Sequence, residues 1–163
     1  MWILVAIAAS AEPTVLVQSD GTVVASAVVA ASADAIHAVV DDLEAVRRLS
    51  PEVLSVTDLG PTSDRCHHVR RETKGLFRPL HFLALRCRTA TGWHEELVES
   101  EDFADYTTDW SITPVEGGTR VEYRVHTSVR LVPASLVAGA VKDSAVGVVA
   151  NLVRLVAPQA AAR

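Results

Sequence analysis

Aromatic side chains are scarce in this sequence: Phe, Trp and Tyr together make up 5% of its 163 residues. Hydrophobic residues still account for 49% of the chain, and most of them are Val, Ala and Leu. A chain of this length folds as one domain and buries a core without metals or cross-links. An interior of small aliphatic side chains is compatible with a hollow core and equally with an ordinary packed one.

Positive charge is also in short supply. The chain has 15 Lys and Arg against 20 Asp and Glu, which gives a formal net charge of −5 and a pI near 5.6. This balance argues against a nucleic-acid partner, because binding to nucleic acid depends on basic side chains that neutralise phosphates. Nor does the sequence contain a cluster of Lys and Arg that would bind an anionic membrane surface.

Catalytic motifs are absent as well. The sequence has no nucleophile elbow, phosphate loop, dinucleotide fingerprint or metalloprotease motif, and no spacing joins Ser and His into a triad. Its two cysteines lack the spacing of a zinc site, so we expect no metal and no cofactor. These absences favour ligand binding over catalysis.

The first eleven residues are apolar and are followed by Glu12-Pro13. Ala9-Ser10-Ala11 has the small-x-small form of a signal-peptidase site, although no positive residue precedes the apolar stretch. We expect residues 1–11 to be an export signal, which places the protein in the periplasm or outside the cell. The alternative is a cytoplasmic protein with a buried or frayed N-terminus. The stretch is too short to span a bilayer, and we expect no transmembrane span elsewhere, because charges interrupt the other apolar stretches.

Period-two patterns predict most of the remaining chain to be β-strands. Asp20-Gly21, a strong hairpin signal, separates two β-rich runs at residues 14–19 and 22–30. Six further runs alternate between apolar and polar residues: 53–59, 65–73, 80–89, 93–100, 106–114 and 119–131. In the last run, alternate positions from Val121 to Val129 are apolar or Thr, while the positions between them are Arg, Glu, His or Ser. This pattern is typical of a sheet with one covered face and one face in water.

Two stretches have apolar residues at helical spacing. The first, residues 31–49, has Ser32 or Asp34 as its N-cap and is ended by Pro51. The second, residues 133–156, begins at Pro133 and carries a broad apolar stripe. A strand pair, a helix, a run of strands and a long helix in this order predict an α+β fold.

Two stretches of the sequence resemble motifs of a known superfamily. Residues 28–44 and 49–53 look like a pattern of strand, small residue, Pro/Ala-x-x-Val-Trp, Asp-Tyr and Pro-x-Val. Residues 102–123 are similar to Gly-Asp-Phe…Trp-x-Leu-x-Pro…Gly-Thr-x-Val-x-Tyr. These residues resemble the START/SRPBCC superfamily of helix-grip proteins, and in particular its polyketide cyclase/dehydrase and coenzyme Q-binding branch. His37 and Leu43 stand where aromatic residues are common in the family.

The resemblance implies a helix-grip fold over residues 14–157. In this fold a curved antiparallel sheet of about seven strands wraps around the long C-terminal helix and leaves a deep cavity. Family members bind lipids, sterols, quinones, polyketides or plant hormones, and a minority catalyse aromatisation or cyclisation. We therefore expect binding or transport of a small hydrophobic ligand. The alternatives are a polyketide cyclase/dehydratase-type enzyme and a protein-interaction module with a collapsed cavity, and a transient protein partner is also compatible with the sequence.

Candidate ligand-binding residues follow from the strand alternation and from the apolar stripe of the last helix. Gly139 and Gly147 lie within that helix, where each glycine costs about 1 kcal/mol relative to Ala. They either leave room for a ligand or let the helix shift, or they reflect close packing or simple tolerance. The candidate wall residues are Tyr106, Trp110, Val121, Tyr123, Val125, Val141, Ala145, Val148, Leu83 and Leu85.

Cys66 and Cys87 are candidates for a disulfide. If residues 74–79 connect two paired strands, each cysteine lies about ten residues from the centre of the hairpin, so the two face each other across the ladder. Opposed Cα atoms about 4.5 Å apart lie within the range that a disulfide requires. A disulfide agrees with export to an oxidising compartment, and the alternative is two free thiols in a cytosolic protein.

Charged and imidazole side chains crowd the central strands. His67, His68, His81 and His94 lack the spacing of a metal site. An inward His68 or His94 would be a polar contact for a ligand, and the alternative is that these histidines lie at the surface. Arg70, Arg71, Arg86 and Arg88 have two interpretations. An inward Arg with Glu72 or Glu96 would orient a polar head group or act as the acid/base pair of a cyclase. The alternative is a solvated outer face with weak ion pairs.

Overall fold

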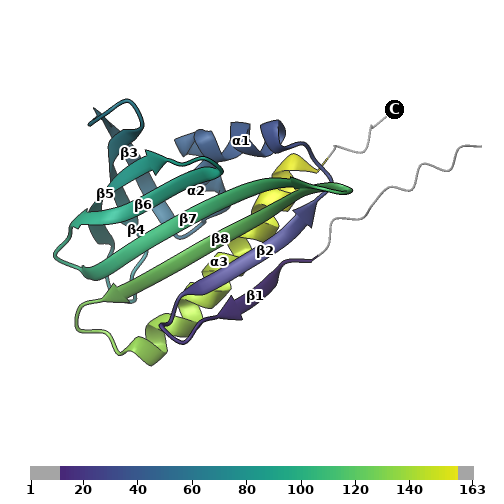
Figure 1. Cartoon of the computed structure of the whole chain (residues 1–163). Helices are drawn as coiled ribbons and strands as arrows, with labels where there is room; N and C mark the ends of the chain where they lie inside the picture. The colour runs from purple at the N-terminus through teal and green to yellow at the C-terminus, as the bar shows by residue number, and fades with distance from the viewer. Residues whose placement is uncertain (1–11, 158–163) are drawn as a thin grey trace, which may run out of the picture.

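Eight antiparallel strands form one strongly curved sheet in the order β1-β2-β8-β7-β6-β5-β4-β3 (Figure 1). The structure is a computed structural model that describes residues 12–157, so the expected signal segment at residues 1–11 lies outside it. The strands are β1 (Thr14–Val17), β2 (Val23–Val29), β3 (Val53–Pro61), β4 (Cys66–Thr73), β5 (Leu80–Arg88), β6 (Gly92–Glu99), β7 (Phe103–Val115) and β8 (Gly118–Val129). The helices are α1 (Ala33–Asp41), α2 (Leu43–Leu49) and α3 (Ala134–Val156). The α+β helix-grip prediction is confirmed, with eight strands in place of about seven because both strands of the N-terminal hairpin join the sheet.

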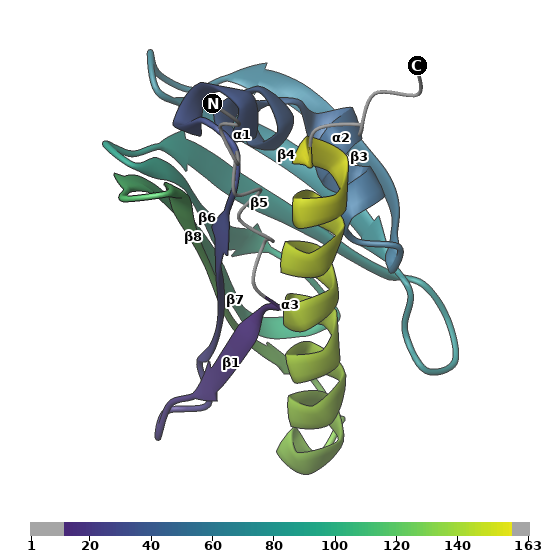
Figure 2. The same cartoon turned by 90° about the vertical axis from the view of Figure 1, so that its right-hand side faces the viewer.

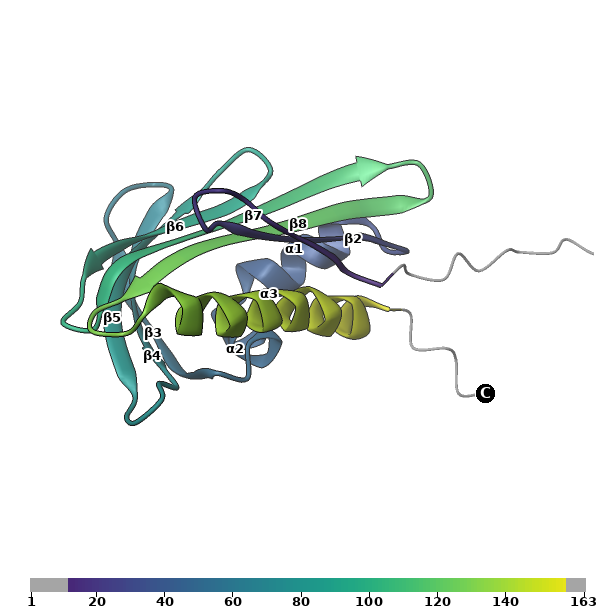
Figure 3. The ribbon, with the colours of Figure 1, turned by 90° about the horizontal axis from the view of Figure 1, so that it is seen from below.

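The sheet bends around α3, which lies along its concave face (Figures 2 and 3). The two short helices lie near the C-terminal end of α3 (Figure 2). Asn151 on α3 donates its Nδ2–H to the carbonyl oxygen of Leu49 at 2.7 Å, which ties α2 to α3. Trp93 on β6 donates its indole N–H to Asp41 at 2.7 Å and ties α1 to the sheet. One end of the fold is therefore closed by helices.

The helix predicted over residues 31–49 is two helices. Ser32 caps α1 by accepting the Ala35 N–H at 3.2 Å, as expected. Asp42 then has an extended backbone, with φ −85° and ψ 113°, and its carboxylate accepts the Glu44 N–H at 2.9 Å. Asp42 therefore ends α1 and caps α2. Asp is strongly favoured as an N-cap residue, and this preference outweighs the apolar periodicity that continues across it.

The ends of two strands differ from the sequence prediction. β7 begins at Phe103 instead of residue 106, because a register shift between Phe103 and Asp105 allows the acidic segment to pair with β8. β8 ends at Val129, and Leu131 beyond it adopts a left-handed backbone with φ 62°. The turn residues Asp102–Asp105 therefore predicted a break where the structure has a β-bulge.

The main core cluster lies at the closed end, between α1, β2, β7, β8 and the C-terminal half of α3. Ile36, Leu49, Val121, Val149 and Leu152 are among its largest fully buried members. A smaller cluster of Phe82, Ala84 and Phe103 lies on β5 and β7. Removal of these side chains from water is the main stabilising term.

α3 is long and apolar enough to cross a membrane, a candidate that the sequence analysis did not expect. In the structure it is the central helix of the fold, and Val148, Val149 and Leu152 of its C-terminal half are buried. An added Cβ at Gly139 or Gly147 would meet nothing within 4 Å. Close packing is therefore not the reason for these two glycines.

Candidate functional site: a cavity under the long helix

A cavity of about 850 Å³ lies between α3 and the concave face of the sheet. Its volume falls within the range of about 300–1,000 Å³ that is usual for small-molecule sites. Six of the ten candidate wall residues line it: Tyr106, Trp110, Tyr123, Val125, Val141 and Val148. The rings of Trp110 and Tyr123 pack against each other with centroids 4.7 Å apart. The interior is thus open, whereas the interaction-module hypothesis requires it to be filled.

The other four candidates do not line the cavity. Val121 and Ala145 are fully buried in the core cluster of the closed end. Leu83 and Leu85 are half-buried on the convex face of β5, since Phe82 occupies an inward position. The Leu83 and Leu85 predictions were wrong because β5 is apolar on both faces, so its sequence does not reveal which face is inward.

The polar part of the cavity floor is a buried ion triad of Arg71, Arg86 and Glu95, from β4, β5 and β6. Each of the three side chains is at most 5% exposed. Arg71 donates Nε–H to Oε2 of Glu95 at 3.0 Å and Nη2–H to Oε1 at 2.6 Å. Arg86 donates Nη1–H to the same Oε1 at 2.8 Å and Nη2–H to the Val40 carbonyl at 2.5 Å. The triad joins three strands to the end of α1.

An inward Arg with Glu72 or Glu96 as its partner was one of the two interpretations of the sequence. The structure places both of these carboxylates on the convex side, because each is one residue away from an inward position. Glu72 instead accepts a hydrogen bond from Ser55 Oγ at 3.3 Å. The inward carboxylate is Glu95, which the sequence analysis missed because adjacent Glu95 and Glu96 differ only in strand register.

The triad is ionised. Burial alone would raise the pKa of Glu95, but the Arg71 and Arg86 guanidinium groups outweigh it and hold the pKa of that carboxyl below its usual value. Two cations and one anion leave one net positive charge beneath the cavity. Arg71 and Glu95 line the cavity directly.

Hydroxyl groups surround the triad on the cavity wall. Thr108 on β7 is opposite Glu95 in the ladder, and Tyr106 and Tyr123 also line the cavity. Burial and the charge of Glu95 raise the pKa of Tyr106 to about 12, and burial raises the pKa of Tyr123 well above its usual value. Both phenols therefore keep their protons at neutral pH and can donate hydrogen bonds.

Residues 20–157 match the model of a protein family described as polyketide cyclase / dehydrase and lipid transport. This chain belongs to that family. None of the curated proteins matches its sequence. The match covers all the strands and helices from β2 onward, and so includes every residue that forms the cavity.

Solved structures share the helix-grip fold of this family member. Zhui aromatase/cyclase from Streptomyces sp. R1128 superposes with a TM-score of 0.74 at 14% identity, over 86% of this chain and 96% of that one. A START superfamily protein from Mycobacterium smegmatis gives 0.71 at 22% identity, over 83% and 96%. A STAR-related lipid transfer protein from Xanthomonas axonopodis gives 0.67 at 16% identity, over 90% and 99%. At these identities the likeness establishes the fold alone.

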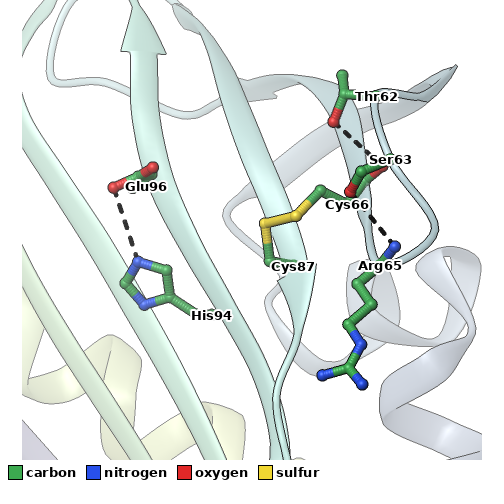
Figure 4. Close-up of a disulfide and its surroundings, with 7 residues drawn as sticks. All are labelled: Thr62, Ser63, Arg65, Cys66, Cys87, His94 and Glu96. Carbon is green, nitrogen blue, oxygen red and sulfur yellow. Dashed lines mark hydrogen bonds and ion pairs between the residues drawn. A yellow bond between two sulfur atoms is a disulfide. The ribbon is translucent and has the colours of Figure 1, made fainter.

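In this member of the polyketide cyclase and lipid transport family, both cysteines lie on the convex face, away from the cavity. Cys66 on β4 is directly opposite Cys87 on β5, with Cα atoms 4.1 Å apart and the sulfurs bonded (Figure 4). His94 on β6 is the next residue across the ladder from Cys87. The bond connects the two strands on the face of the sheet opposite the cavity.

The histidines also lie away from the cavity wall. His94 contacts Asp109 at 2.7 Å and lies beside Glu96 on the convex face (Figure 4), and His68 shares that face. The structure therefore agrees with the surface interpretation of His68 and His94 and not with the inward one. Within residues 12–157, no group of three or more His, Cys, Asp or Glu side chains is placed to hold a metal ion.

The open end of the cavity is bordered by apolar side chains that face solvent. Leu76 and Phe77 lie in the β4–β5 loop, Leu131 follows β8, and Leu136 lies in the first turn of α3. Phe77 is 99% exposed, and Leu131 is fully exposed in a left-handed conformation that bulky residues rarely adopt. This rim was not predicted from the sequence, although Leu76-Phe77, two adjacent large apolar residues in a connecting loop, were a usable signal.

An ion pair anchors the β4–β5 loop. Arg78 donates Nη2–H to Asp102 Oδ1 at 2.5 Å, and Asp102 Oδ2 accepts the His81 N–H at 2.8 Å. Asp102 is buried, and the hydrogen bond from the His81 backbone, together with Arg78, holds the pKa of its carboxyl below its usual value. The rim is therefore attached to the turn before β7.

Proposed function

We propose that this protein binds and carries a small hydrophobic ligand, such as a lipid, a quinone or a polyketide-like molecule, in the cavity beneath α3. The observation that supports this function best is the cavity itself. It has ligand-sized volume, mostly apolar buried walls and one buried group of polar side chains around the triad. This combination is typical of sites that bind a molecule by its apolar body and orient it by one polar end.

Binding energy would come mainly from the apolar walls. Each Å² of apolar ligand surface removed from water contributes about 25 cal/mol. Val125, Val141 and Val148 face this space from β8 and α3 and offer aliphatic contacts, while Trp110 offers an aromatic one. The triad and its neighbouring hydroxyl groups would orient the bound ligand, with its polar end towards Arg71 and Glu95.

A cyclase or dehydratase activity is the second candidate, because the triad places ionised groups next to the cavity. A general base must accept a proton from the substrate. Oε1 of Glu95 already accepts hydrogen bonds from both arginines, and Oε2 accepts one from Arg71. A carboxylate with a lowered pKa and three guanidinium hydrogen bonds is a weak base, so the triad supports binding better than proton transfer.

Filling the cavity tests the carrier function. Val141→Trp adds a large ring to the cavity wall, and we expect the affinity for a fluorescent hydrophobic probe such as 1-aminoanthracene to fall at least about tenfold, since it removes the space for the probe. The matched control is Lys142→Trp, which adds the same ring to an exposed position next to it. Equal binding by both variants, or no binding by the unmodified protein, would contradict the proposal.

We also propose that the protein acts in the periplasm or outside the cell. The apolar segment with Ala9-Ser10-Ala11 and the Cys66–Cys87 bond support this location, since structural disulfides persist in oxidising compartments. Mass spectrometry of the protein from its own host should give an N-terminus at Glu12 and no thiol that reacts with iodoacetamide. An intact residue 1 with two reactive thiols would place the protein in the cytoplasm.

A further inference from the structure

The buried ion triad has an unequal charge count. Glu95 is shared by Arg71 and Arg86, so one positive charge has no carboxylate of its own. Other acidic residues on the cavity wall are engaged or lie at the rim: Asp102 pairs with Arg78, while Glu52 and Glu101 are exposed. A buried charge without a counter-charge is costly, and an anionic group brought into the cavity would neutralise it.

Of the two arginines, Arg71 is the one that lines the cavity. Its Nε and Nη2 bind Glu95, whereas Nη1 makes no hydrogen bond to any residue within 12–157. Arg86 is held differently, with Glu95, the Val40 carbonyl and the face of Trp93 around its guanidinium, which lies 4.3 Å from the ring centroid. Arg71 is thus the buried cation with a free donor towards the ligand space.

Apart from Glu95, the groups around Arg71 include hydroxyl donors. Tyr106 and Tyr123 keep their phenolic protons, and the Thr108 hydroxyl lies opposite Glu95 in the ladder. A guanidinium edge with neutral hydroxyl donors recognises an oxygen anion, because charge-assisted hydrogen bonds are the strongest that side chains make. Most of the remaining buried wall is apolar and suits a hydrocarbon chain or ring, while the other cations that line the cavity, Lys74, Arg78 and Arg130, are exposed.

We infer that the ligand is an amphiphile with an anionic oxygen head group, a carboxylate or a phosphate, which binds Arg71 while its apolar body fills the cavity towards α3. This inference rests on the carrier function proposed above and specifies its ligand class. It assigns Arg71 to ligand recognition and Arg86 to holding Glu95 and α1 in place.

A pair of probes that differ only in charge tests the inference. cis-Parinaric acid is a fluorescent fatty acid, and its methyl ester has the same chain without the anion. We expect the unmodified protein to bind the acid at least about tenfold more tightly than the ester, as a charge-assisted hydrogen bond predicts. In Arg71→Met the preference should fall to about one, since Arg86 and Glu95 then form a neutral pair.

Arg70→Met is the matched control. Arg70 is exposed and lies one residue away on the convex face, so this variant loses the same net charge without changing the cavity. It should keep the preference of the unmodified protein. Competition by hexadecanoate and by hexadecyl phosphate identifies which anion binds more tightly, and displacement by either supports the inference.

The outcomes separate the inference from the proposed function. Equal affinities for acid and ester in the unmodified protein would overturn the anionic head group while leaving the carrier function intact. A preference that survives Arg71→Met would overturn the assignment of Arg71. Failure of the unmodified protein to bind either probe would count against the carrier function itself. If Arg71→Met does not fold, Arg71→Lys, which keeps the charge but has no free Nη1, should lower the preference without abolishing it.

Discussion

The two halves of α3 both carry apolar side chains but have opposite roles. In the C-terminal half, Ala145, Val148, Val149 and Leu152 are buried in or against the core. In the N-terminal half, no residue from 134 to 144 is buried, and Leu136 is 62% exposed. The comparison teaches that an apolar helix can complete a core at one end and cover an open cavity at the other. Each prediction below tests this division.

The largest effect is expected at the triad, where the cavity meets the packed part of the fold. Glu95→Gln leaves Arg71 and Arg86 buried with a neutral partner, and loss of one partner of a buried ion pair costs about 3–5 kcal/mol of unfolding free energy. Urea unfolding measures this loss. Glu96→Gln, on the exposed convex side, should change stability by less than about 0.5 kcal/mol. Similar losses in both variants would mean that the triad has no special role.

The two halves of α3 can be compared directly by shortening one leucine in each. Leu152→Ala removes a fully buried side chain and should cost about 2–5 kcal/mol. Leu136→Ala removes an exposed one and should change the unfolding free energy by less than about 0.5 kcal/mol. A large loss for Leu136→Ala in urea unfolding would show that the N-terminal half also packs into the core.

The contribution of Glu95 should depend on pH. Because its folded-state pKa lies below the ordinary value of 4.5, the stability that its ionisation provides is fully present above about pH 4.5. It is lost as the pH falls through the lower, folded-state pKa. The difference in unfolding free energy between the unmodified protein and Glu95→Gln should therefore narrow below about pH 4.5. A difference that stays constant down to pH 3 would contradict an ionised triad.

The smallest effects are expected at the helix glycines. An added methyl group meets no neighbour at either position, so Gly139→Ala and Gly147→Ala should each raise the unfolding free energy by about 1 kcal/mol. Thermal unfolding measures both. If Gly139→Ala also slows release of a bound probe while Gly147→Ala does not, flexibility of the N-terminal half of α3 has a role in ligand exchange. A lower unfolding free energy in either variant would show that the added methyl group meets a contact that the structure lacks.

Much of the fold was readable from residue patterns. Asp20-Gly21 marked the first hairpin, the alternation from Val121 to Val129 marked the inward face of β8, and the spacing of Cys66 and Cys87 matched their register. These features depend on residues near in sequence or paired across one turn. The split at Asp42 was missed because a single cap residue outweighs helical periodicity.

The candidate site was less predictable for a physical reason. Adjacent strand residues face opposite sides, so a shift of one position exchanges Glu95 for Glu96 and Phe82 for Leu83. Only the register of the whole sheet, set by long-range packing, decides which of each pair enters the cavity. The exposed rim at Phe77 and Leu131 likewise depends on two connections that are distant in sequence.

Native mass spectrometry of the protein purified from its own host tests the central claim most directly. We expect a species heavier than the chain by one small molecule, which is lost on denaturation and recovered by organic extraction as a hydrophobic compound. The same preparation of Val141→Trp should give the mass of the chain alone. An unmodified protein that carries no ligand from its host and takes up no hydrophobic probe would contradict the account.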